Sequence, residues 1–437
     1  MANKVEPRIL SGFLELLPED QLIFDWMKET IEKTYKKHGY VSVETPIIEY
    51  SEVLLAKAGG ETEKQIYRFN KGDNDLSLRF DHTVPLARYV AKNYPYLVFP
   101  FKRYSIGKVF RGERPQKGRF REFYQCDIDV IGNEVLDLTY DSELPLIIYD
   151  TFVNLGFKNI TINLNNRKIL NGLFSELNIT ELKDDVLRLI DKLDKIGYEN
   201  FVLSLKDYIS DENTISKILA FLNINGSCKE IISQLKQLNY TDETFNTGIV
   251  ELETVINNMI ALNMKEENFA INLKIARGLD YYTGTIYETF LDDYKELGSV
   301  CSGGRYNDLS SFYTDKVLPG VGISIGLTRL YSKLKELNYY NNIAKTSTKV
   351  MVIDLEGGLN EALSLTTRLR NEDIKVDMPH LLNKGMKQKM QYANRLGIPY
   401  VIIIGEDEVK NKVYAFKDMT KGLQETLTYD QLLERLK

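Results

Sequence analysis

The sequence is poor in the residues that build disulfide frameworks and metal sites. Among its 437 residues there are only three cysteines and three histidines. Cys126, Cys228 and Cys301 lie far apart with no C-x-x-C spacing, which argues against a disulfide framework or a zinc site. Three histidines leave almost nothing for a histidine-centred triad or a multi-histidine metal centre. We therefore expect a reducing, cytoplasmic compartment.

Long apolar runs and the common phosphate-binding glycine patterns are also absent. No run approaches membrane-spanning length, and the opening MANKVEPRIL lacks the apolar core of a secretory signal, so no membrane partner is expected. The glycines of GVGISIGLTRL, residues 320–330, follow G-x-G-x-x-x-G and miss the dinucleotide pattern, and no G-x-x-x-x-G-K-[ST] loop occurs. A nucleotide site in this chain must be of another kind.

The remaining composition is that of a globular protein with more than one domain. Hydrophobic residues make up 43% and charged residues 27%, and the net charge is -6. At this length two or three domains are expected. The net charge favours no partner, so nucleic-acid contact would depend on local patches such as the basic loop at residues 114–121.

The stretch FRGERPQKGRFREFYQCDIDVIG, residues 110–132, predicts two strands joined by that basic loop. Side chains of a strand alternate between its faces, and in the second strand the residues of one face are mostly polar. These are Arg121, Phe123, Gln125, Asp127 and Asp129. The opposite face is apolar. Such a face is suited to form the base of a site for an anionic, ring-bearing ligand. The alternative interpretation is an amphipathic hairpin whose polar face is solvated.

Two stretches upstream of the hairpin carry proline-marked strands. GYVSVETPIIEY, residues 39–50, predicts a strand that Pro46 confines to a sheet edge or an interface. LSLRFDHTVPLARYVAKNY, residues 76–94, predicts a strand followed by a helix from Pro85. Arg79, Asp81 and Thr83 would share the outward face of that strand. Capping of the following helix is an equally good explanation for Asp81 and Thr83.

The hydrophobic periodicity of the sequence changes twice in the rest of the chain. Helical periods dominate residues 171–252, which we interpret as an insertion between residues 1–170 and 253–335. After a linker, residues 345–437 alternate strands with helices at 359–370, 386–396 and 429–436. This alternation predicts a small α/β domain with a mostly parallel sheet.

Together these motifs resemble class II aminoacyl-tRNA synthetases, and among them the histidyl-tRNA synthetase family. GYVSVETPIIEY, FRGERPQKGRFREFYQ and GVGISIGLTRL are similar to the three motifs that all class II enzymes share. RGLDYYTGTIYE and SGGRYNDL are similar to the two motifs of the histidine enzymes, and the tail resembles their anticodon-binding domain. The resemblance implies an α+β catalytic domain on an antiparallel sheet (residues 1–170 and 253–335), a helical insertion and a C-terminal α/β anticodon-binding domain.

The family's reaction joins L-histidine to histidine tRNA through a histidyl-adenylate, with ATP as substrate and Mg²⁺ present, whose ligands the sequence does not identify. Such chemistry needs positioning and charge stabilisation more than a protein nucleophile. By resemblance, Arg277 and Arg111 are catalytic, gripping the α-phosphate from opposite faces. The implied ATP-binding residues are Arg111, Glu113, Arg119, Phe123 and Arg329. Phe123 would stack on adenine and Arg329 would cover its other side.

The resemblance also implies a histidine pocket and a tRNA contact. The implied histidine-binding residues are Asp81, Thr83, Arg111, Gln125, Asp129, Arg277, Tyr281, Tyr282 and Tyr306. Bacterial relatives often have glutamate where this chain has Asp81 and Asp129, which leaves room for a bridging water. Arg114 and Gln116 match positions that read the extra guanylate of histidine tRNA. A homodimer with the Pro46 strand near its interface is expected from the family.

Two other functions share parts of this pattern. The regulatory subunit of ATP phosphoribosyltransferase keeps the catalytic-domain shape without catalysis, but it usually lacks both the anticodon domain and the RGLDYY signature. Class II enzymes for threonine, proline or glycine share the tail domain, but RGLDYY is not expected in them. Both are therefore weaker hypotheses than the histidine enzyme.

Overall fold

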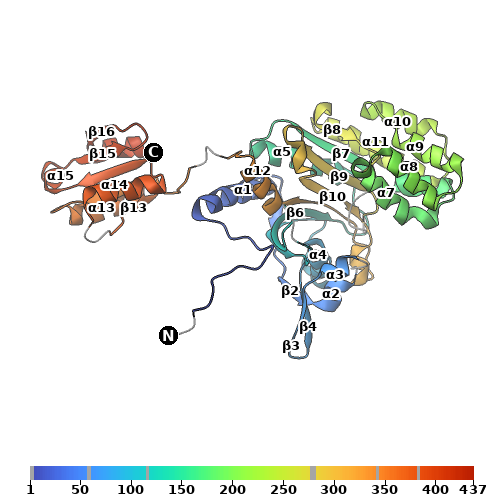
Figure 1. Cartoon of the computed structure of the whole chain (residues 1–437), viewed down its shortest axis with the longest axis horizontal. Coiled ribbons are helices and arrows are strands. Elements are labelled where there is room, and N and C mark those ends of the chain that lie inside the picture. Colours follow the sequence, from blue (N-terminus) through green and yellow to red (C-terminus); the bar gives the residue numbers. More distant parts are fainter. Residues whose placement is uncertain (1–3, 57–60, 115–117, 276–281, 341–343, 381–383) are drawn as a thin grey trace. The chain divides into compact units, whose positions relative to one another are not determined.

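The computed structural model describes residues 4–56, 61–114, 118–275, 282–340, 344–380 and 384–437 (Figure 1). The chain divides into two compact units. One comprises Met1–Leu14 and Met27–Leu337, and the other comprises Glu15–Trp26 and Asn338–Lys437. None of the helices in these described ranges is both long and apolar enough to span a bilayer.

The first unit is built on an eight-stranded sheet in the order β1-β5-β6-β11-β10-β9-β7-β8. Its bounds are β1 (Val41–Ser42), β5 (Phe101–Phe110), β6 (Glu122–Ile131), β7 (Ile160–Asn166), β8 (Phe269–Ile271), β9 (Thr285–Leu291), β10 (Cys301–Tyr306) and β11 (Gly320–Gly326). The six strands from β5 to β7 pair antiparallel, and β1 and β8 join the edges in parallel. This is the predicted α+β architecture on an antiparallel sheet.

Strands β5 and β6 form the predicted hairpin. Their register sets Arg103 opposite Asp129 and Ser105 opposite Asp127, so the polar face of β6 continues onto this part of β5. The apolar face is buried, and Tyr35 of helix α1 (Pro18–Lys37) donates a hydrogen bond to the carbonyl of Cys126 at 3.1 Å. β5 ends at Phe110, so Arg111 and Glu113 follow the strand, although alternation had extended it through them.

The predicted strand at residues 39–50 divides at Pro46, because proline cannot donate to a ladder. Its first part is β1, at the edge of the large sheet. Its second part is β2 (Ile48–Tyr50), at the edge of a three-stranded sheet with β4 (Asn74–Leu78) and β3 (Arg68–Lys71). The predicted edge placement is confirmed.

The expectation that Arg79 shares an outward face with Asp81 and Thr83 was wrong. β4 ends at Leu78, and the Arg79 side chain turns inward, where it is fully buried. Its guanidinium donates to the carbonyls of Thr45 and Lys108 at 2.7 and 2.8 Å. A buried guanidinium needs such acceptors, and here they lie on two neighbouring segments. Asp81 precedes helix α4 (Thr83–Asn93), whose first residue is Thr83.

Helices follow several strands of the first unit. Short α2 (Ser51–Leu55) and α3 (Glu61–Gln65) follow β2, α5 (Thr139–Asn154) follows β6, and α12 (Leu327–Glu336) follows β11. The stretch expected to be a helical insertion, residues 171–252, is helical, but its first helix begins before it and its last helix ends after it. The helices are α6 (Arg167–Glu176), α7 (Lys183–Ile196), α8 (Tyr198–Tyr208), α9 (Glu212–Leu222), α10 (Cys228–Gln237) and α11 (Glu243–Ala261). Helix α11 packs along α6 and also contacts α5 and β7.

The second unit contains a five-stranded sheet with helices on both faces. Its bounds are β12 (Val350–Asp354), α13 (Leu359–Asn371), β13 (Val376–Asp377), α14 (Met386–Leu396), β14 (Tyr400–Ile404), α15 (Glu406–Asn411), β15 (Tyr414–Asp418), β16 (Gln424–Leu427) and α16 (Tyr429–Leu436). The sheet is mixed, because β13, β12 and β14 are parallel and β15 and β16 are antiparallel. The prediction of a mostly parallel sheet therefore missed this half, where the β15–β16 connection is too short for a parallel crossover.

Candidate functional site

Two adjoining cavities lie over the polar face of the central sheet. The first has a volume of about 400 Å³ and the second about 480 Å³. They share part of their lining, which comes from the hairpin, β10, β11 and α12: Arg111, Gln125, Ser299, Ser302, Ser324 and Arg329. A ligand can therefore extend from one cavity into the other.

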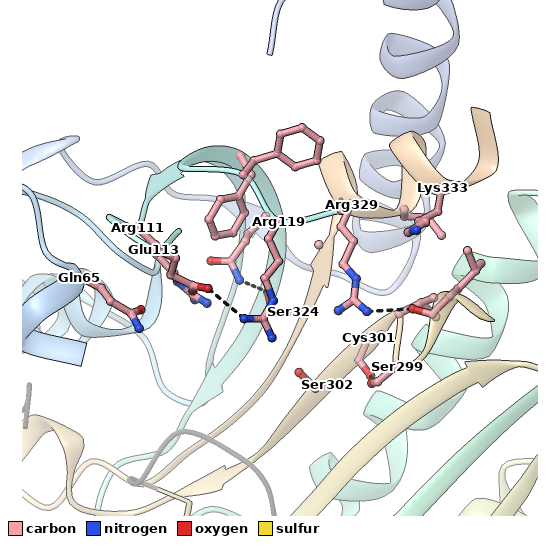
Figure 2. A pocket seen from close by; sticks show the side chains of 18 residues that line it. Gln65, Arg111, Glu113, Arg119, Ser299, Cys301, Ser302, Ser324, Arg329 and Lys333 are labelled. Carbon is pink, nitrogen blue, oxygen red and sulfur yellow. Dashed lines mark hydrogen bonds and ion pairs between the residues drawn. The ribbon is translucent and has the colours of Figure 1, made fainter. Parts of the chain in front are cut away.

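The first cavity is lined by cations. Arg111 and Glu113 line one side of it, Arg329 and Lys333 the other, and Arg119 lies between them (Figure 2). Arg119 is 3.4 Å from the carboxylate of Glu113. Several guanidinium groups around one space form a ready site for a polyanion, because the planar fork of arginine matches phosphate oxygens.

Backbone carbonyls hold two of these arginines in place. Arg111 donates through Nε to the Phe80 carbonyl at 3.1 Å, and Arg329 donates through Nη2 to the Leu297 carbonyl at 2.9 Å. Burial, together with the neighbouring charge of Arg119, lowers the pKa of Arg329. The Arg111 guanidinium also lies 5.2 Å from the centre of the Phe123 ring. Guanidinium groups and an aromatic face thus meet at the join of the two cavities.

The second cavity is acidic and rich in tyrosine. Its lining includes Asp81, Asp127, Asp129, Tyr282 and Tyr306. Burial raises the pKa of Asp81 to about 6 and that of Asp127 to about 7. Burial also raises the pKa of Asp129, against the opposing effect of a neighbouring arginine. A buried cluster of carboxyl groups suits a small ligand that carries positive charge and N–H donors.

Asp81 both caps a helix and faces this cavity. One carboxylate oxygen accepts a hydrogen bond from the Val84 backbone N–H at 3.1 Å, at the start of α4. The other oxygen is buried and has no hydrogen-bond partner among the described residues. The capping explanation of Asp81 is thus confirmed, and one oxygen still remains for a ligand.

Asp129 lies at the inner end of the cavity in a polar cluster. The Tyr306 hydroxyl donates to Asp129 Oδ1 at 2.7 Å, and Arg103 Nη2 lies 2.9 Å from Asp129 Oδ2. The glycines of β11 make this approach possible, because a Cβ on Gly320 would lie 2.4 Å from the Tyr306 ring. A Cβ on Gly322 would lie 2.3 Å from Asp129 Oδ1. The G-x-G spacing of this strand therefore makes room for side chains and cradles no phosphate.

A second polar chain crosses from β6 to β11. Gln125 Nε2 donates to Ser324 Oγ at 3.0 Å, and Ser324 Oγ donates to Asp127 Oδ1 at 2.5 Å. This chain fixes the amide of Gln125 at the boundary between the cationic and the acidic cavity.

The chain matches known proteins over both units. A family model described as histidyl-tRNA synthetase matches residues 12–330, and one described as an anticodon binding domain matches residues 349–437. The chain belongs to the histidyl-tRNA synthetase family. Its class II fold, predicted from the sequence, is confirmed.

Individual relatives agree with this assignment. The chain is 50% identical over 434 residues to a histidine–tRNA ligase of Clostridium tetani, covering 99% of this chain and 98% of the relative. A second such ligase, from Finegoldia magna, is 46% identical over 99% and 100% of the two chains. The crystal structure of histidyl-tRNA synthetase from a Nostoc species matches with a TM-score of 0.91 at 39% identity, covering 99% of each chain.

The regulatory-subunit alternative is not favoured by these comparisons. A Bacillus halodurans structure, described as an ATP phosphoribosyltransferase regulatory subunit/histidyl-tRNA synthetase, matches with a TM-score of 0.77. Its identity is only 20%, so it shows the shared fold alone.

Most residues predicted for a histidyl-tRNA synthetase site line these cavities. The predicted ATP residues that line the first cavity are Arg111, Glu113, Arg119, Phe123 and Arg329. The predicted histidine residues that line the second are Asp81, Thr83, Arg111, Gln125, Asp129, Tyr282 and Tyr306. Arg114 is exposed and lines neither cavity. Arg277, Tyr281 and Gln116 lie outside the described residues.

Several residues that line or adjoin the cavities were missed by the sequence-based site, among them Asp127, Lys333, Ser324 and Arg103. Asp127 shares the polar face of β6 with Gln125 and Asp129, so alternation alone could have included it. Lys333 lies one helical turn after Arg329, a spacing that could have added it to the first cavity. Ser324 and Arg103 carry no signal in the sequence, because their partners lie on other strands.

Proposed function

We propose that the two cavities hold ATP and histidine side by side and that the chain forms histidyl-adenylate there before charging tRNA. A carboxylate oxygen of histidine attacks the α-phosphorus, the bond to the β-phosphate oxygen breaks, and pyrophosphate leaves. A hydroxyl of the terminal tRNA adenosine then attacks the carbonyl carbon and AMP leaves. The observation that carries this proposal is the shared lining of a cationic and an acidic cavity.

On the ATP side, the arginines act by position and charge. Arg111 lies at the join of the cavities, where the α-phosphate would react, and we assign it to that phosphate. Arg329 and Arg119 neutralise the outer phosphates, and Phe123 takes the adenine. Arg277, catalytic by family resemblance, grips the α-phosphate from the face opposite Arg111. Fixed cations aimed at developing charge are usually the largest contribution to such catalysis.

On the histidine side, the two ends of the substrate meet different groups. Asp81, Thr83 and Gln125 receive the amino and carboxylate ends, close to Arg111. Asp129, Tyr282 and Tyr306 receive the imidazole, and Tyr281 belongs to the same set by resemblance. Buried groups that pair with a ring N–H reject analogues lacking it, because their own hydrogen bonds are then left unmade.

The described residues of the two cavities offer few carboxylates that suit Mg²⁺. Among the described residues, no three His, Cys, Asp or Glu side chains cluster as metal ligands. Glu113 lines the ATP cavity and its carboxylate is partly exposed, which fits an ion that binds one or two carboxylates and the substrate phosphates. We propose Glu113 as its protein ligand. When bound, Mg²⁺ supplies positive charge to the phosphates of ATP.

The remaining parts of the chain serve the tRNA and the assembly. We divide the chain into a catalytic domain at residues 1–170 and 253–335, an insertion at 171–252 and an anticodon-binding domain at 345–437. The family match at residues 349–437 supports the last of these. Arg114 and Gln116 contact the front of histidine tRNA. The family points to the cytoplasm as the compartment.

We propose a homodimer that uses the segment around Pro46. Four apolar side chains in this segment are exposed: Val41, Ile47, Ile48 and Tyr50. Exposed apolar clusters of this kind commonly form interfaces. Sedimentation of an Ile48→Asp variant tests this, because the variant should be monomeric where the parent is dimeric. An unchanged sedimentation coefficient would place the interface elsewhere.

One experiment tests the whole proposal. ATP–pyrophosphate exchange is measured with each standard amino acid in turn, with Mg²⁺ present and without tRNA. Only histidine should support exchange, because the acidic cavity selects for its ring and amino group. Exchange with another amino acid, or with none, would contradict the assigned function.

A further inference from the structure

Arg103 is a buried cation at the acidic cavity that the proposed function leaves without a role. It lies on β5 directly opposite Asp129 of β6, and its side chain is 2% exposed. Its Nη2 lies 2.9 Å from Asp129 Oδ2 and also donates to the His82 carbonyl at 2.9 Å. His82 lies between Asp81 and Thr83, so one guanidinium links the two ends of the proposed histidine pocket.

Arg103 is the counter-charge of the acidic cluster. Burial alone would favour the protonated form of each carboxyl group there. The charge of Arg103 opposes this effect and lowers the pKa of Asp81, Asp127 and Asp129. Asp129 is its direct partner, because Arg103 Nη2 lies 2.9 Å from Asp129 Oδ2. Arg103 therefore favours the ionised form of Asp129, and an arginine cannot itself lose its proton under ordinary conditions.

The charge of Asp129 sets the direction of the hydrogen bond to Tyr306. A carboxylate only accepts, so the Tyr306 hydroxyl donates its proton to Asp129 Oδ1 at 2.7 Å. With its proton so committed, the phenol can offer a ligand only oxygen lone pairs. A protonated Asp129 could donate instead, and the phenol proton could then turn toward the ligand. The charge at Asp129 thus decides whether this end of the cavity accepts or donates.

We propose that Arg103 is a specificity-determining positioning residue, which through Asp129 and Tyr306 makes the inner end of the cavity an acceptor for the N–H of the imidazole ring. This inference rests on the proposed function and names how the same site selects its substrate. Arg103 Nε has no hydrogen-bond partner among the described residues, and Asp129 Oδ2 has only its ion-pair contact with Arg103. Buried polar groups left unsatisfied need an explanation, and a ligand in the adjoining cavity supplies one.

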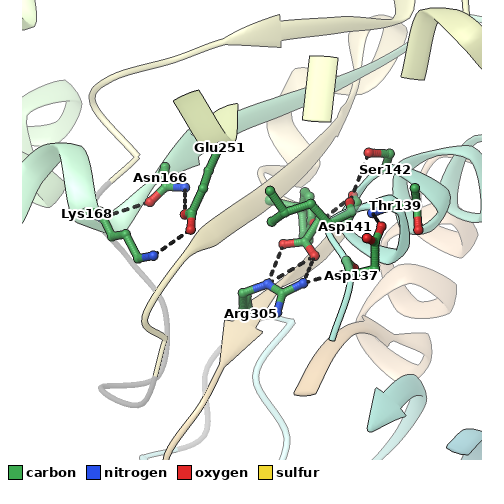
Figure 3. Close-up of polar contacts among 10 residues, drawn as sticks. Asp137, Thr139, Asp141, Ser142, Asn166, Lys168, Glu251 and Arg305 are labelled. Atoms are coloured by element: carbon green, nitrogen blue, oxygen red, sulfur yellow. Dashed lines mark hydrogen bonds and ion pairs between the residues drawn. The ribbon is translucent and has the colours of Figure 1, made fainter. Parts of the chain in front are cut away.

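The sheet offers a matched control in a second buried arginine. Arg305 on β10 ion-pairs with Asp141 of α5 and donates to the Asp137 carbonyl at 3.2 Å (Figure 3). Arg305 and Tyr306 are successive residues of one strand, so they point to opposite faces. Arg305 lines neither cavity. The same substitution at Arg305 thus reports the structural cost of losing a buried arginine.

The test compares Arg103→Gln, Arg103→Lys, Arg305→Gln and the parent chain by histidine-dependent exchange between about pH 7 and 8.5, above the pKa of about 6.5 of a free imidazole ring. For Arg103→Gln at neutral pH, the KM for histidine should rise at least about tenfold, the scale of one hydrogen bond to a charged group. The KM for ATP should stay near that of the parent. The rise should shrink as the pH increases, because alkali restores the Asp129 charge. Arg103→Lys keeps the charge and should keep the parental pH profile.

The titration is read as a difference between variant and parent, because other groups face Asp129. These are Arg103, Asp81, Asp127, Tyr40, Tyr282 and Tyr306. In an Asp129→Asn background, the substitution Arg103→Gln should cost little more, since both act through one carboxylate. A second readout is inhibition by 2-thiazolylalanine, whose ring accepts hydrogen bonds but has no N–H. It should compete better against histidine in Arg103→Gln than in the parent.

Three results would overturn the proposal. They are an unchanged KM for histidine in Arg103→Gln, a rise that is equal at every pH, or the same loss in the Asp129→Asn background. If Arg103→Gln does not fold, Arg103→Lys decides, because an alkaline-shifted KM profile in that variant contradicts a role through charge. A parent chain without histidine-dependent exchange would instead refute the proposed function.

Discussion

Arg305 and Arg103 are both buried arginines of the central sheet, and each faces an aspartate. Arg305 Nε donates to both oxygens of Asp141 at 3.0 and 3.1 Å, and Nη2 bonds both Asp141 and the Asp137 carbonyl. Arg103 makes one contact to Asp129 and leaves its Nε unused. The saturated pair, in which both oxygens of Asp141 are bonded, joins α5 to the sheet and lines neither cavity. The unsaturated pair borders a cavity, where spare hydrogen-bonding capacity has a use.

The largest expected effect breaks the saturated pair. Asp141→Ala should lower the free energy of unfolding of the first unit by about 3 to 5 kcal/mol, because Arg305 would remain charged and buried without a partner. Urea denaturation followed by circular dichroism measures this. As a control, the double substitution Asp141→Leu with Arg305→Met removes both charges and should regain most of the loss. A double variant as unstable as Asp141→Ala would mean that the charge pair itself supplies the stability.

A second prediction concerns a residue expected to act on substrate and to contribute little to stability. Arg277→Ala should slow adenylate formation by about 10² or more, as for the loss of a donor aimed at transition-state charge. Pre-steady-state adenylate formation and ATP–pyrophosphate exchange measure it. The thermal unfolding midpoint should match the parent, unlike that of Asp141→Ala. Near-normal exchange would remove Arg277 from the catalytic set.

The acidic cavity should make the free energy of unfolding depend on pH. The folded pKa of Asp127 is about 7, above the unfolded value of 3.8. The folded state therefore binds this proton more tightly, so its contribution to stability is greatest below about pH 4 and falls as the pH rises toward 7. Asp127→Asn removes this dependence. Relative to the parent, the variant should gain roughly 2 kcal/mol in its free energy of unfolding between pH 4 and 8. The upper limit for a shift from 3.8 to about 7 is about 4 kcal/mol, at about 1.4 kcal/mol per pKa unit.

That measurement needs denaturation curves at both pH values for both chains. Asp127→Asn keeps an oxygen to accept from Ser324, so the polar chain to Gln125 should survive. A parallel pH dependence in variant and parent would show that Asp127 stays ionised in the folded chain.

The smallest effect is expected from removing the second unit's sheet. Both arginine pairs lie in the first unit, so deletion of residues 345–437 should leave histidine-dependent exchange within about twofold of the parent. Charging of tRNA should weaken, and its salt dependence should become less steep as phosphate contacts are lost. Filter-binding and aminoacylation across a salt series measure this. Loss of exchange would place the tail within the catalytic core or the dimer.

The sequence predicted those parts of the molecule that depend on local patterns. Strand alternation identified the polar face of β6, and the helix expected at residues 386–396 has the same bounds as α14. In the site, alternation gathered Phe123, Gln125 and Asp129 before any strand had been paired.

The parts that the sequence missed depend on neighbours distant in the chain. Arg103 looks like a solvated cation in FKRYSIGK, and only the register of β5 with β6 brings it opposite Asp129. Arg79 leaves the expected strand because acceptors on two other segments await it. The antiparallel half of the tail sheet depends likewise on the pairing of β15 with β16. Periodicity says which way a side chain points, but not what it meets.

Strand β6 also sets the spacing between the residues that we propose to contact the substrates. Phe123, Gln125, Asp127 and Asp129 occupy every second position, and such positions are about 6.6 to 6.8 Å apart along a strand. In the proposed function, about 20 Å of strand therefore separate Phe123, assigned to the purine, from Asp129, assigned to the imidazole. A one-residue shift in the register of the whole strand would turn all four side chains to the other face at once. Substitutions at these four positions can therefore change the contacts one side chain at a time, while the spacing of the positions along the strand stays constant.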